Sequence, residues 1–186
     1  MRVLLVDNYD SFTFNLVHLV EPLVDELVVW RNDEIIFEDV ASFDKIIFSP
    51  GPSLPSQAGD LMKLIKQFYQ TIPMFGVCLG MQAILESFGG ELENLEPVRH
   101  GMVQKIKVVQ KQIFEGMATN QEVGLYHSWG VTSKLLPDCF NNLATDIDDV
   151  VMACSHKKWR IAGVQFHPES IMTPNGDEII NNWIKE

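Results

Sequence analysis

Short apolar runs alternate with segments of helical periodicity in the first half of the chain, and this alternation constrains the fold most strongly. The apolar runs, each long enough for one buried strand, lie at 3–6, 27–30, 46–48 and 73–77. Segments with apolar residues at helical spacing lie between and after them, at 12–19, 58–71 and 79–88. Strands and helices in this order join through right-handed crossovers, so the pattern predicts a mainly parallel sheet flanked by helices.

The second half of the chain lacks this alternation. Its strand-like segments are joined by polar turns with little helix between them, at 104–110, 123–131, 150–155 and 161–166. This pattern predicts an antiparallel extension of the same open sheet. The last segment, 176–186, has the apolar face of a helix. The chain has no linker or internal repeat, so we expect one α/β domain over residues 1–186.

Composition excludes several classes of function. Fourteen Lys and Arg against twenty-five Asp and Glu give a net charge of −11, which argues against a nucleic-acid partner. No apolar run approaches the roughly 20 residues that span a bilayer, and the first ten residues lack a signal-peptide core, so we expect no membrane association and a cytoplasmic location. The three cysteines and five histidines have no metal-ligand spacing, so we expect reduced thiols and neither a metal site nor a cofactor.

Cys78 lies in the most informative segment, Gly76-Val77-Cys78-Leu79-Gly80, between a predicted strand and a predicted helix. This spacing is typical of a sharp turn that lifts a nucleophile above the carboxyl edge of a parallel sheet. The helix N-terminus would favour the thiolate, and the Leu79 N–H would face a developing oxyanion. On its own the segment leaves open a second interpretation, in which Cys78 is a small buried apolar residue.

A thiol nucleophile needs a base, and the base needs a group that orients it. His167 and Glu169 follow the apolar segment 161–166 and are separated by one proline. In an extended segment, residues two apart project the same way, so the two side chains are expected to converge. A solvated turn is the alternative for these two residues taken alone. Together with the cysteine turn, they predict a Cys78–His167–Glu169 triad.

The chain resembles the class I glutamine amidotransferase family over nearly its whole length. The resemblance rests on three motifs in the family's order: Pro50-Gly51-Pro52, the nucleophile segment 76–82, and Gly-Val-Gln-Phe-His-Pro-Glu-Ser at 163–170. The segments 7–13, 99–101 and 126–128 look like the branch formed by the small subunits of anthranilate synthase and aminodeoxychorismate synthase. This resemblance implies hydrolysis of L-glutamine and delivery of ammonia to a chorismate-converting large subunit.

The resemblance also implies roles for individual residues. Cys78 would attack the glutamine carboxamide, with His167 as base and Glu169 orienting it. The backbone N–H groups of Gly51 and Leu79 would form the oxyanion hole. The residues that would bind glutamine are Gly51, Pro52, Ser53, Gln82, Ser128 and Trp129.

The chain departs from the pattern of this branch at several positions. Ser53 replaces a glycine after Pro50-Gly51-Pro52, and a serine there is strained if its φ is positive. Trp129 replaces a commoner leucine, and Met102 stands where a lysine is frequent. These departures leave the triad intact and bear on partner recognition.

Three other functions remain open from the residues. The same triad would serve a cysteine peptidase or a γ-glutamyl hydrolase, and a catalytically silent regulatory module would only bind the synthase. The choice between the anthranilate pathway of tryptophan synthesis and the aminodeoxychorismate pathway of folate synthesis is also open, because that chemistry belongs to the large subunit.

Overall fold

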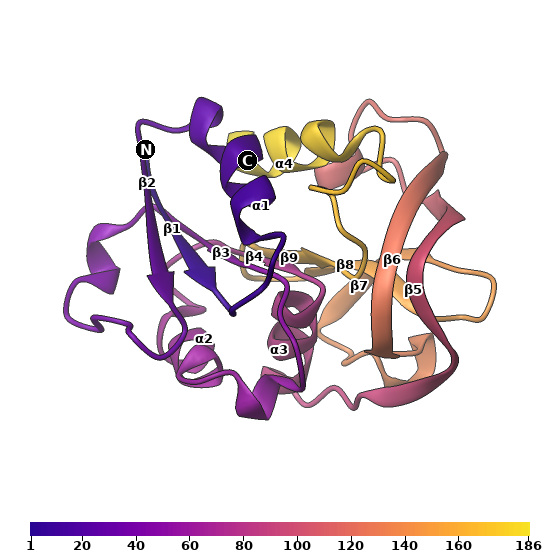
Figure 1. Ribbon diagram of the computed structural model, residues 1–186, viewed down its shortest axis with the longest axis horizontal. Helices are drawn as coiled ribbons and strands as arrows, with labels where there is room; N and C mark the ends of the chain where they lie inside the picture. Colours follow the sequence, from indigo (N-terminus) through magenta and orange to yellow (C-terminus); the bar gives the residue numbers. More distant parts are fainter.

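Figure 1 shows the computed structural model, which describes residues 1–186 apart from the side chain at position 97. Nine strands form one sheet: β1 (Arg2–Asp7), β2 (Glu26–Arg31), β3 (Lys45–Phe48), β4 (Met74–Val77), β5 (Glu93–Val108), β6 (Asn120–Gly130), β7 (Phe140–Thr145), β8 (Val151–His156) and β9 (Ile161–Val164). Their order in the sheet is β2-β1-β3-β4-β9-β8-β7-β5-β6. Both parallel and antiparallel pairs of strands occur in it, so the sheet is mixed, as the sequence predicted.

The parallel half of the sheet contains β2, β1, β3, β4 and β9. β1 shows why its sequence is an uninterrupted apolar run. Val3 and Leu5 pack into the core on one face, while Leu4 and Val6 pack into the core on the other. Strands covered on both faces by helices need apolar residues at every position.

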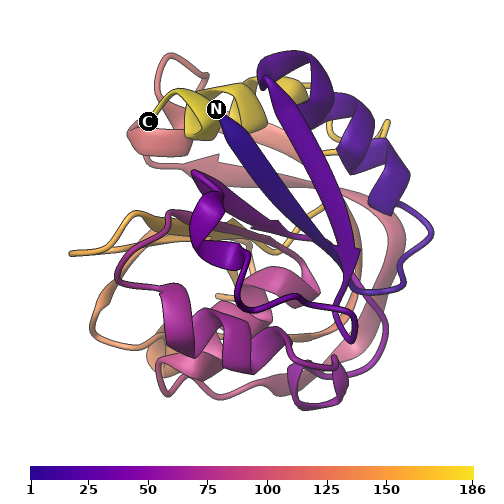
Figure 2. The same ribbon diagram turned by 90° about the vertical axis from the view of Figure 1, so that its left-hand side faces the viewer.

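Helices cover both faces of this half (Figure 2). α1 and α4 lie on one face and contact each other, and α2 and α3 lie on the opposite face in contact. The four helices are α1 (Thr13–Val20), α2 (Leu61–Phe68), α3 (Leu79–Ser87) and α4 (Gly176–Lys185). Short 3-10 turns occupy Glu21–Leu23, Val40–Ser42, Pro55–Gln57, Gln112–Phe114 and Ser133–Leu135. Among the described residues, no helix has the length and apolar character that crossing a membrane needs.

The antiparallel half extends from β9, which pairs parallel with β4 and antiparallel with β8. The segment 161–166 was predicted in the antiparallel extension, but its strand β9 closes the parallel half instead. Sequence analysis missed β7, whose Asn141 and Asn142 obscure the strand pattern. It also missed the first part of β5, where the pairing with β6 shifts register twice, between Asn94 and Arg99 and between His100 and Met102. Each bulge interrupts the period-2 alternation by which a strand is found in a sequence.

Candidate active site

Cys78 occupies the single residue between β4 and α3, at the carboxyl edge of the parallel strands. Its backbone has φ 52° and ψ −106°, a conformation that costs a non-glycine residue about 1–3 kcal/mol and that persists only where the surroundings impose it. The Cys78 N–H donates to the carbonyl oxygen of Val164 in β9 at 2.8 Å, which holds the turn against the neighbouring strand. The turn predicted from the sequence is confirmed.

Two glycines, Gly76 and Gly80, allow this turn because a side chain at either position would collide with neighbouring backbone. A Cβ at Gly76 would lie 2.4 Å from the carbonyl carbon of Gly80. A Cβ at Gly80 would lie 2.5 Å from the carbonyl oxygen of Phe48 in β3. Real Cβ atoms essentially never approach backbone so closely. The first turn of α3 can therefore sit directly on the sheet only with glycine at both positions.

His167 and Glu169 form a buried pair just beyond β9. His167 Nδ1 lies 2.7 Å from Glu169 Oε1, and both side chains are almost completely shielded from solvent. The rings of Tyr126 and Phe12 pack edge-on against the imidazole, with centroids 4.9 and 5.8 Å away. Because Nδ1 donates to the carboxylate, Nε2 is left as the reactive nitrogen. Nε2 forms no hydrogen bond within the usual distance and angle limits, although Cys78 lies close enough to raise the pKa of the imidazole.

The convergence of His167 and Glu169 was predicted, but the reason given for it was wrong. β9 ends at Val164, so the two residues do not lie in an extended strand. They lie in a turn in which the Ser170 N–H donates to the His167 carbonyl oxygen at 3.2 Å. The turn, and not strand alternation, brings the carboxylate back to the imidazole.

The electrostatic surroundings of His167 favour its protonated form. Burial lowers the pKa of His167, but the neighbouring Cys78 sulfur and the Glu169 carboxylate raise it by more than burial lowers it. The net result is a pKa of about 10. An imidazolium with this pKa stabilises a thiolate beside it. The site therefore holds a protonated imidazole beside the Cys78 sulfur, an arrangement that suits a cysteine nucleophile.

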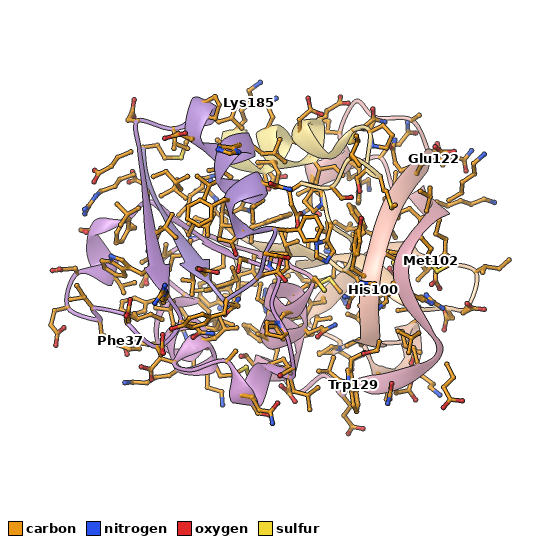
Figure 3. The ribbon with its side chains drawn as sticks, viewed as in Figure 1. Phe37, His100, Met102, Glu122, Trp129 and Lys185 are labelled. Carbon is orange, nitrogen blue, oxygen red and sulfur yellow. The ribbon has the colours of Figure 1, made fainter. Side chains whose placement is uncertain are left out.

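A cavity of about 160 Å³ opens beside Cys78, and the predicted glutamine-binding residues line it. The Pro50–Ser53 loop forms one wall and the end of β6 forms another, with Trp129 near the end of that strand (Figure 3). Two lining residues, Tyr126 and His127, were not among the predicted binding residues. The full lining consists of Gly51, Pro52, Ser53, Cys78, Gln82, Tyr126, His127, Ser128 and Trp129.

Of the two predicted oxyanion donors, Gly51 lines this cavity and Leu79 directly follows Cys78, which also lines it. The Gly51 N–H donates to no group among the described residues, and the Leu79 N–H lies in the first turn of α3, where N–H groups lack intrahelical partners. A Cβ at Gly51 would lie 2.6 Å from Asn8 Cβ and from a Leu79 methyl group, so the loop packs tightly on the nucleophile turn. Ser53 has φ 68°. This serine therefore adopts the strained left-handed conformation that was expected if the position of the family's glycine requires a positive φ.

Gln165 contacts Cys78 and was not among the site residues predicted from the sequence. Its Nε2 lies 3.5 Å from Cys78 Sγ, and its side chain is completely buried. A signal was available in the sequence. Gln165 is the one strongly polar residue in the apolar segment 161–166, and a buried amide needs hydrogen-bond partners.

The described residues contain no group of three His, Cys, Asp and Glu side chains that could hold a metal ion. Cys154 lies on β8 and is completely buried, and burial raises the pKa of its thiol far above the ordinary range. Cys139 is partly buried. Of the three thiols, therefore, Cys78 alone lines the cavity.

Comparison with known proteins agrees with this geometry. The chain is 44% identical over 185 residues to the aminodeoxychorismate/anthranilate synthase component 2 of Bacillus subtilis, covering 98% of this chain and 95% of the relative. It is 38% identical over 184 residues to the aminodeoxychorismate synthase component 2 of Escherichia coli, covering 98% of both. A solved structure from Thermoplasma acidophilum, described as a candidate component of GMP synthase, superposes with a TM-score of 0.89 at 25% identity, covering 100% of this chain and 92% of that one.

The family described as glutamine amidotransferase class-I matches residues 4–186. The match includes the nucleophile turn, the Pro50–Ser53 loop and the His167–Glu169 turn. This chain belongs to the class-I glutamine amidotransferase family.

Proposed function

We propose that this chain is the glutaminase subunit of a chorismate-using synthase, which releases ammonia from L-glutamine for a large subunit. The arrangement of Cys78, His167 and Glu169 beside one cavity is the observation that carries this proposal. A silent regulatory module would need no such arrangement. A buried imidazole with a carboxylate partner and a raised pKa is costly to maintain without a chemical role.

The triad accounts for the reaction in two steps. The Cys78 sulfur attacks the carboxamide carbon, and the N–H groups of Gly51 and Leu79 stabilise the negative charge on oxygen. His167 Nε2 gives its proton to the departing nitrogen, so that ammonia leaves and a glutamyl thioester remains. His167 then takes a proton from water, the hydroxide attacks the thioester carbon, and glutamate leaves as the thiolate is restored.

Gln82 supplies an acceptor for the amino group of the substrate. Its Nε2 already donates to the Trp129 carbonyl oxygen at 2.9 Å. Its Oε1 is therefore the atom free to accept from the α-ammonium group of glutamine. Ser128 and Trp129 would hold the α-carboxylate, with their backbone N–H groups as donors.

The partner would cover the surface around the cavity. Ile171 is 96% exposed. Its neighbour in the sequence, Ser170, is close to the site, because Ser170 Oγ lies 3.0 Å from the Tyr126 hydroxyl. Met102 is also exposed, on β5 next to β6 (Figure 3). We infer that these two exposed apolar side chains contact the large subunit. A large subunit bound there would receive ammonia before it is protonated in bulk water.

Both pathways of chorismate amination are candidates, because one relative carries both synthase names and another carries the aminodeoxychorismate name alone. We favour an anthranilate synthase component II, and the aminodeoxychorismate synthase subunit is the second candidate. Purifying the large subunit that binds this chain and identifying its product from chorismate separates the two. A cytoplasmic location and the absence of a cofactor stay predictions from the sequence.

The decisive experiment replaces the nucleophile in the assembled complex. In Cys78→Ala, we expect glutamine-dependent synthesis to fall by at least about 10³-fold, because no thioester forms. Synthesis from added ammonium salts should be unchanged. Cys139→Ala, which removes a partly buried thiol outside the cavity, is the matched control and should behave as the unmodified chain.

Normal glutamine hydrolysis by Cys78→Ala would overturn the proposal. Assays on γ-glutamyl peptides and on unrelated peptides test the hydrolase alternatives, since those enzymes would prefer these substrates to glutamine. Failure of a glutamine-mimicking electrophile to modify Cys78 in the complex would instead favour the silent module.

A further inference from the structure

A chain of buried polar groups links the Cys78 sulfur to the opposite wall of the cavity. Gln165 Nε2 lies 3.5 Å from Cys78 Sγ, and Gln82 Nε2 donates to Gln165 Oε1 at 3.1 Å. Gln82 Nε2 also donates to the Trp129 carbonyl oxygen at 2.9 Å. On its other side, the same carbonyl oxygen lies 3.0 Å from His127 Nδ1. The side chains of Gln165, Gln82 and His127 are all buried.

The backbone carbonyl of Trp129 decides the direction of every hydrogen bond in this chain of polar groups. A carbonyl oxygen only accepts, so Gln82 must present its NH₂ group to it. The same NH₂ group also faces Gln165, which must therefore present its oxygen to Gln82. The NH₂ group of Gln165 is then left to face sulfur. The orientation of the Gln165 amide follows from a backbone atom and has no equal alternative.

His127 strengthens this arrangement from the far end. Burial lowers the pKa of His127 to about 4, although its contact with the Trp129 carbonyl raises it in part. The imidazole is therefore neutral at physiological pH, and its single N–H is at Nδ1, because a carbonyl requires a donor there. Both donors to the Trp129 carbonyl are thus fixed, and the carbonyl cannot release Gln82 without leaving a buried donor unpaired.

We propose that Gln165 is a further residue of the nucleophile site, which donates a hydrogen bond to the Cys78 sulfur and thereby stabilises the thiolate and holds it toward His167. The inference rests on the proposed function, because it has meaning only if Cys78 is the nucleophile. A hydrogen bond to an ionised acceptor is about twice as strong as one between neutral groups, so the amide favours the thiolate over the thiol.

The same bond acts at both steps of the reaction. Before attack, it increases the fraction of Cys78 present as thiolate. When the thioester forms, the sulfur loses its charge and the bond weakens. When water attacks the thioester, the sulfur leaves as a thiolate and the bond strengthens again, which favours that departure. Loss of the amide should therefore slow thioester hydrolysis, and it should slow thioester formation to the extent that it lowers the fraction of Cys78 present as thiolate.

Isosteric and apolar variants separate this role from simple filling of space. Gln165→Glu keeps the shape and accepts from Gln82, but its carboxylate has no donor for the sulfur. Gln165→Met keeps the length without polar atoms. If Gln165 only filled space, Gln165→Met would leave thiol reactivity unchanged, whereas the carboxylate of Gln165→Glu would still disfavour the thiolate by its charge. Under the proposal both variants weaken the thiolate, and Gln165→Glu does so more, because its negative charge faces the sulfur.

The readout is the pH dependence of Cys78 alkylation by iodoacetamide in the full chain, with the modified cysteine identified by peptide mass. We expect the pH of half-maximal rate to rise by about one unit in Gln165→Met and by more in Gln165→Glu. Gln121→Glu is the matched control. Gln121 is a buried amide of β6 that donates to the Ala118 carbonyl oxygen at 2.7 Å and does not contact Cys78. Its alkylation profile should match that of the unmodified chain.

An unchanged profile in Gln165→Met, with selective alkylation of Cys78 in the unmodified chain, would overturn this inference and leave the proposed function intact. If Cys78 reacts no faster than Cys139 and Cys78→Ala retains glutaminase activity, the proposed function itself fails. Should either variant fail to fold, Gln165→Asn takes its place. Its amide is one methylene too short to reach the sulfur, and the same upward shift is expected.

Discussion

The nucleophile turn and the base segment lie at the ends of neighbouring strands, yet they are built differently. β4 and β9 pair in parallel, with Val77 opposite Val164, and the two segments follow at the same sheet edge. The turn at Cys78 owes its geometry to the backbone, through a positive φ and two glycines. In the base segment a backbone turn brings Glu169 to His167, and the imidazole is then held by side chains, namely Glu169 and two aromatic rings.

This difference predicts different tolerances to substitution. The nucleophile turn has no space for an added atom, because backbone packs on backbone and interiors do not relax easily. The base segment tolerates a change that keeps its shape, but not the loss of charge or of a hydrogen-bond partner. Sterics should therefore dominate on one side of the site and electrostatics on the other.

The largest effect is expected from an added methyl group in the turn. In Gly76→Ala the new Cβ would collide with the backbone at Gly80 and Met81. We expect the free energy of unfolding, measured by urea denaturation, to fall by more than about 3 kcal/mol, or the chain to fail to fold. Gly101→Ala is the control, since Gly101 has φ 68° but nothing within 4 Å of an added Cβ. It should lose only about 1–2 kcal/mol. Equal losses would show that the turn is not sterically tight.

Glu169→Gln tests the other side of the comparison. The amide keeps the size of the carboxylate and can still accept from Nδ1, but it no longer stabilises the imidazolium. We expect kcat/KM for glutamine to fall by about 10²–10⁴-fold, with a much smaller change in the free energy of unfolding. Ammonia-dependent synthesis by the complex is the internal control. A variant that kept full glutaminase activity would show that the carboxylate does not orient the base.

His127 sharpens the comparison, because it is a second buried imidazole whose partner is a carbonyl and not a carboxylate. Burial lowers its pKa to about 4 from an ordinary value of 6.5. Between these two pH values the unfolded chain binds the proton and the folded chain does not. The free energy of unfolding should therefore decrease as pH falls from 6.5 to 4, by at most about 3 kcal/mol from this group.

The measurement for His127 is urea unfolding at pH 7 and at pH 4.5, compared with His127→Gln. The variant lacks the titrating group, so its loss of stability over the same interval should be smaller. Equal acid sensitivity in both proteins would mean that His127 is protonated in the folded state. His167 has the opposite sign, since its raised pKa gives a contribution that is present below pH 6.5 and lost as pH rises toward 10.

Sequence reasoning succeeded where local chemistry decides the structure. β1 is apolar at every position between its ends because both of its faces are buried, so composition alone identifies it. The turn at Cys78 requires glycines at fixed spacing, which makes it visible as a motif. β5 and β7 escaped prediction because bulges and asparagines remove the alternation on which strand prediction depends.

The sequence by itself determined the individual apolar strands, the nucleophile turn and the pairing of His167 with Glu169, because each depends on residues within a few positions of one another. Only the tertiary structure decided that Gln165 contacts the Cys78 sulfur and that Trp129 sets the direction of the amide chain. These contacts join residues 47 to 87 positions apart, on α3, on β6 and beyond β9. No local pattern encodes a hydrogen bond across that separation, since it exists only once the strands are placed side by side.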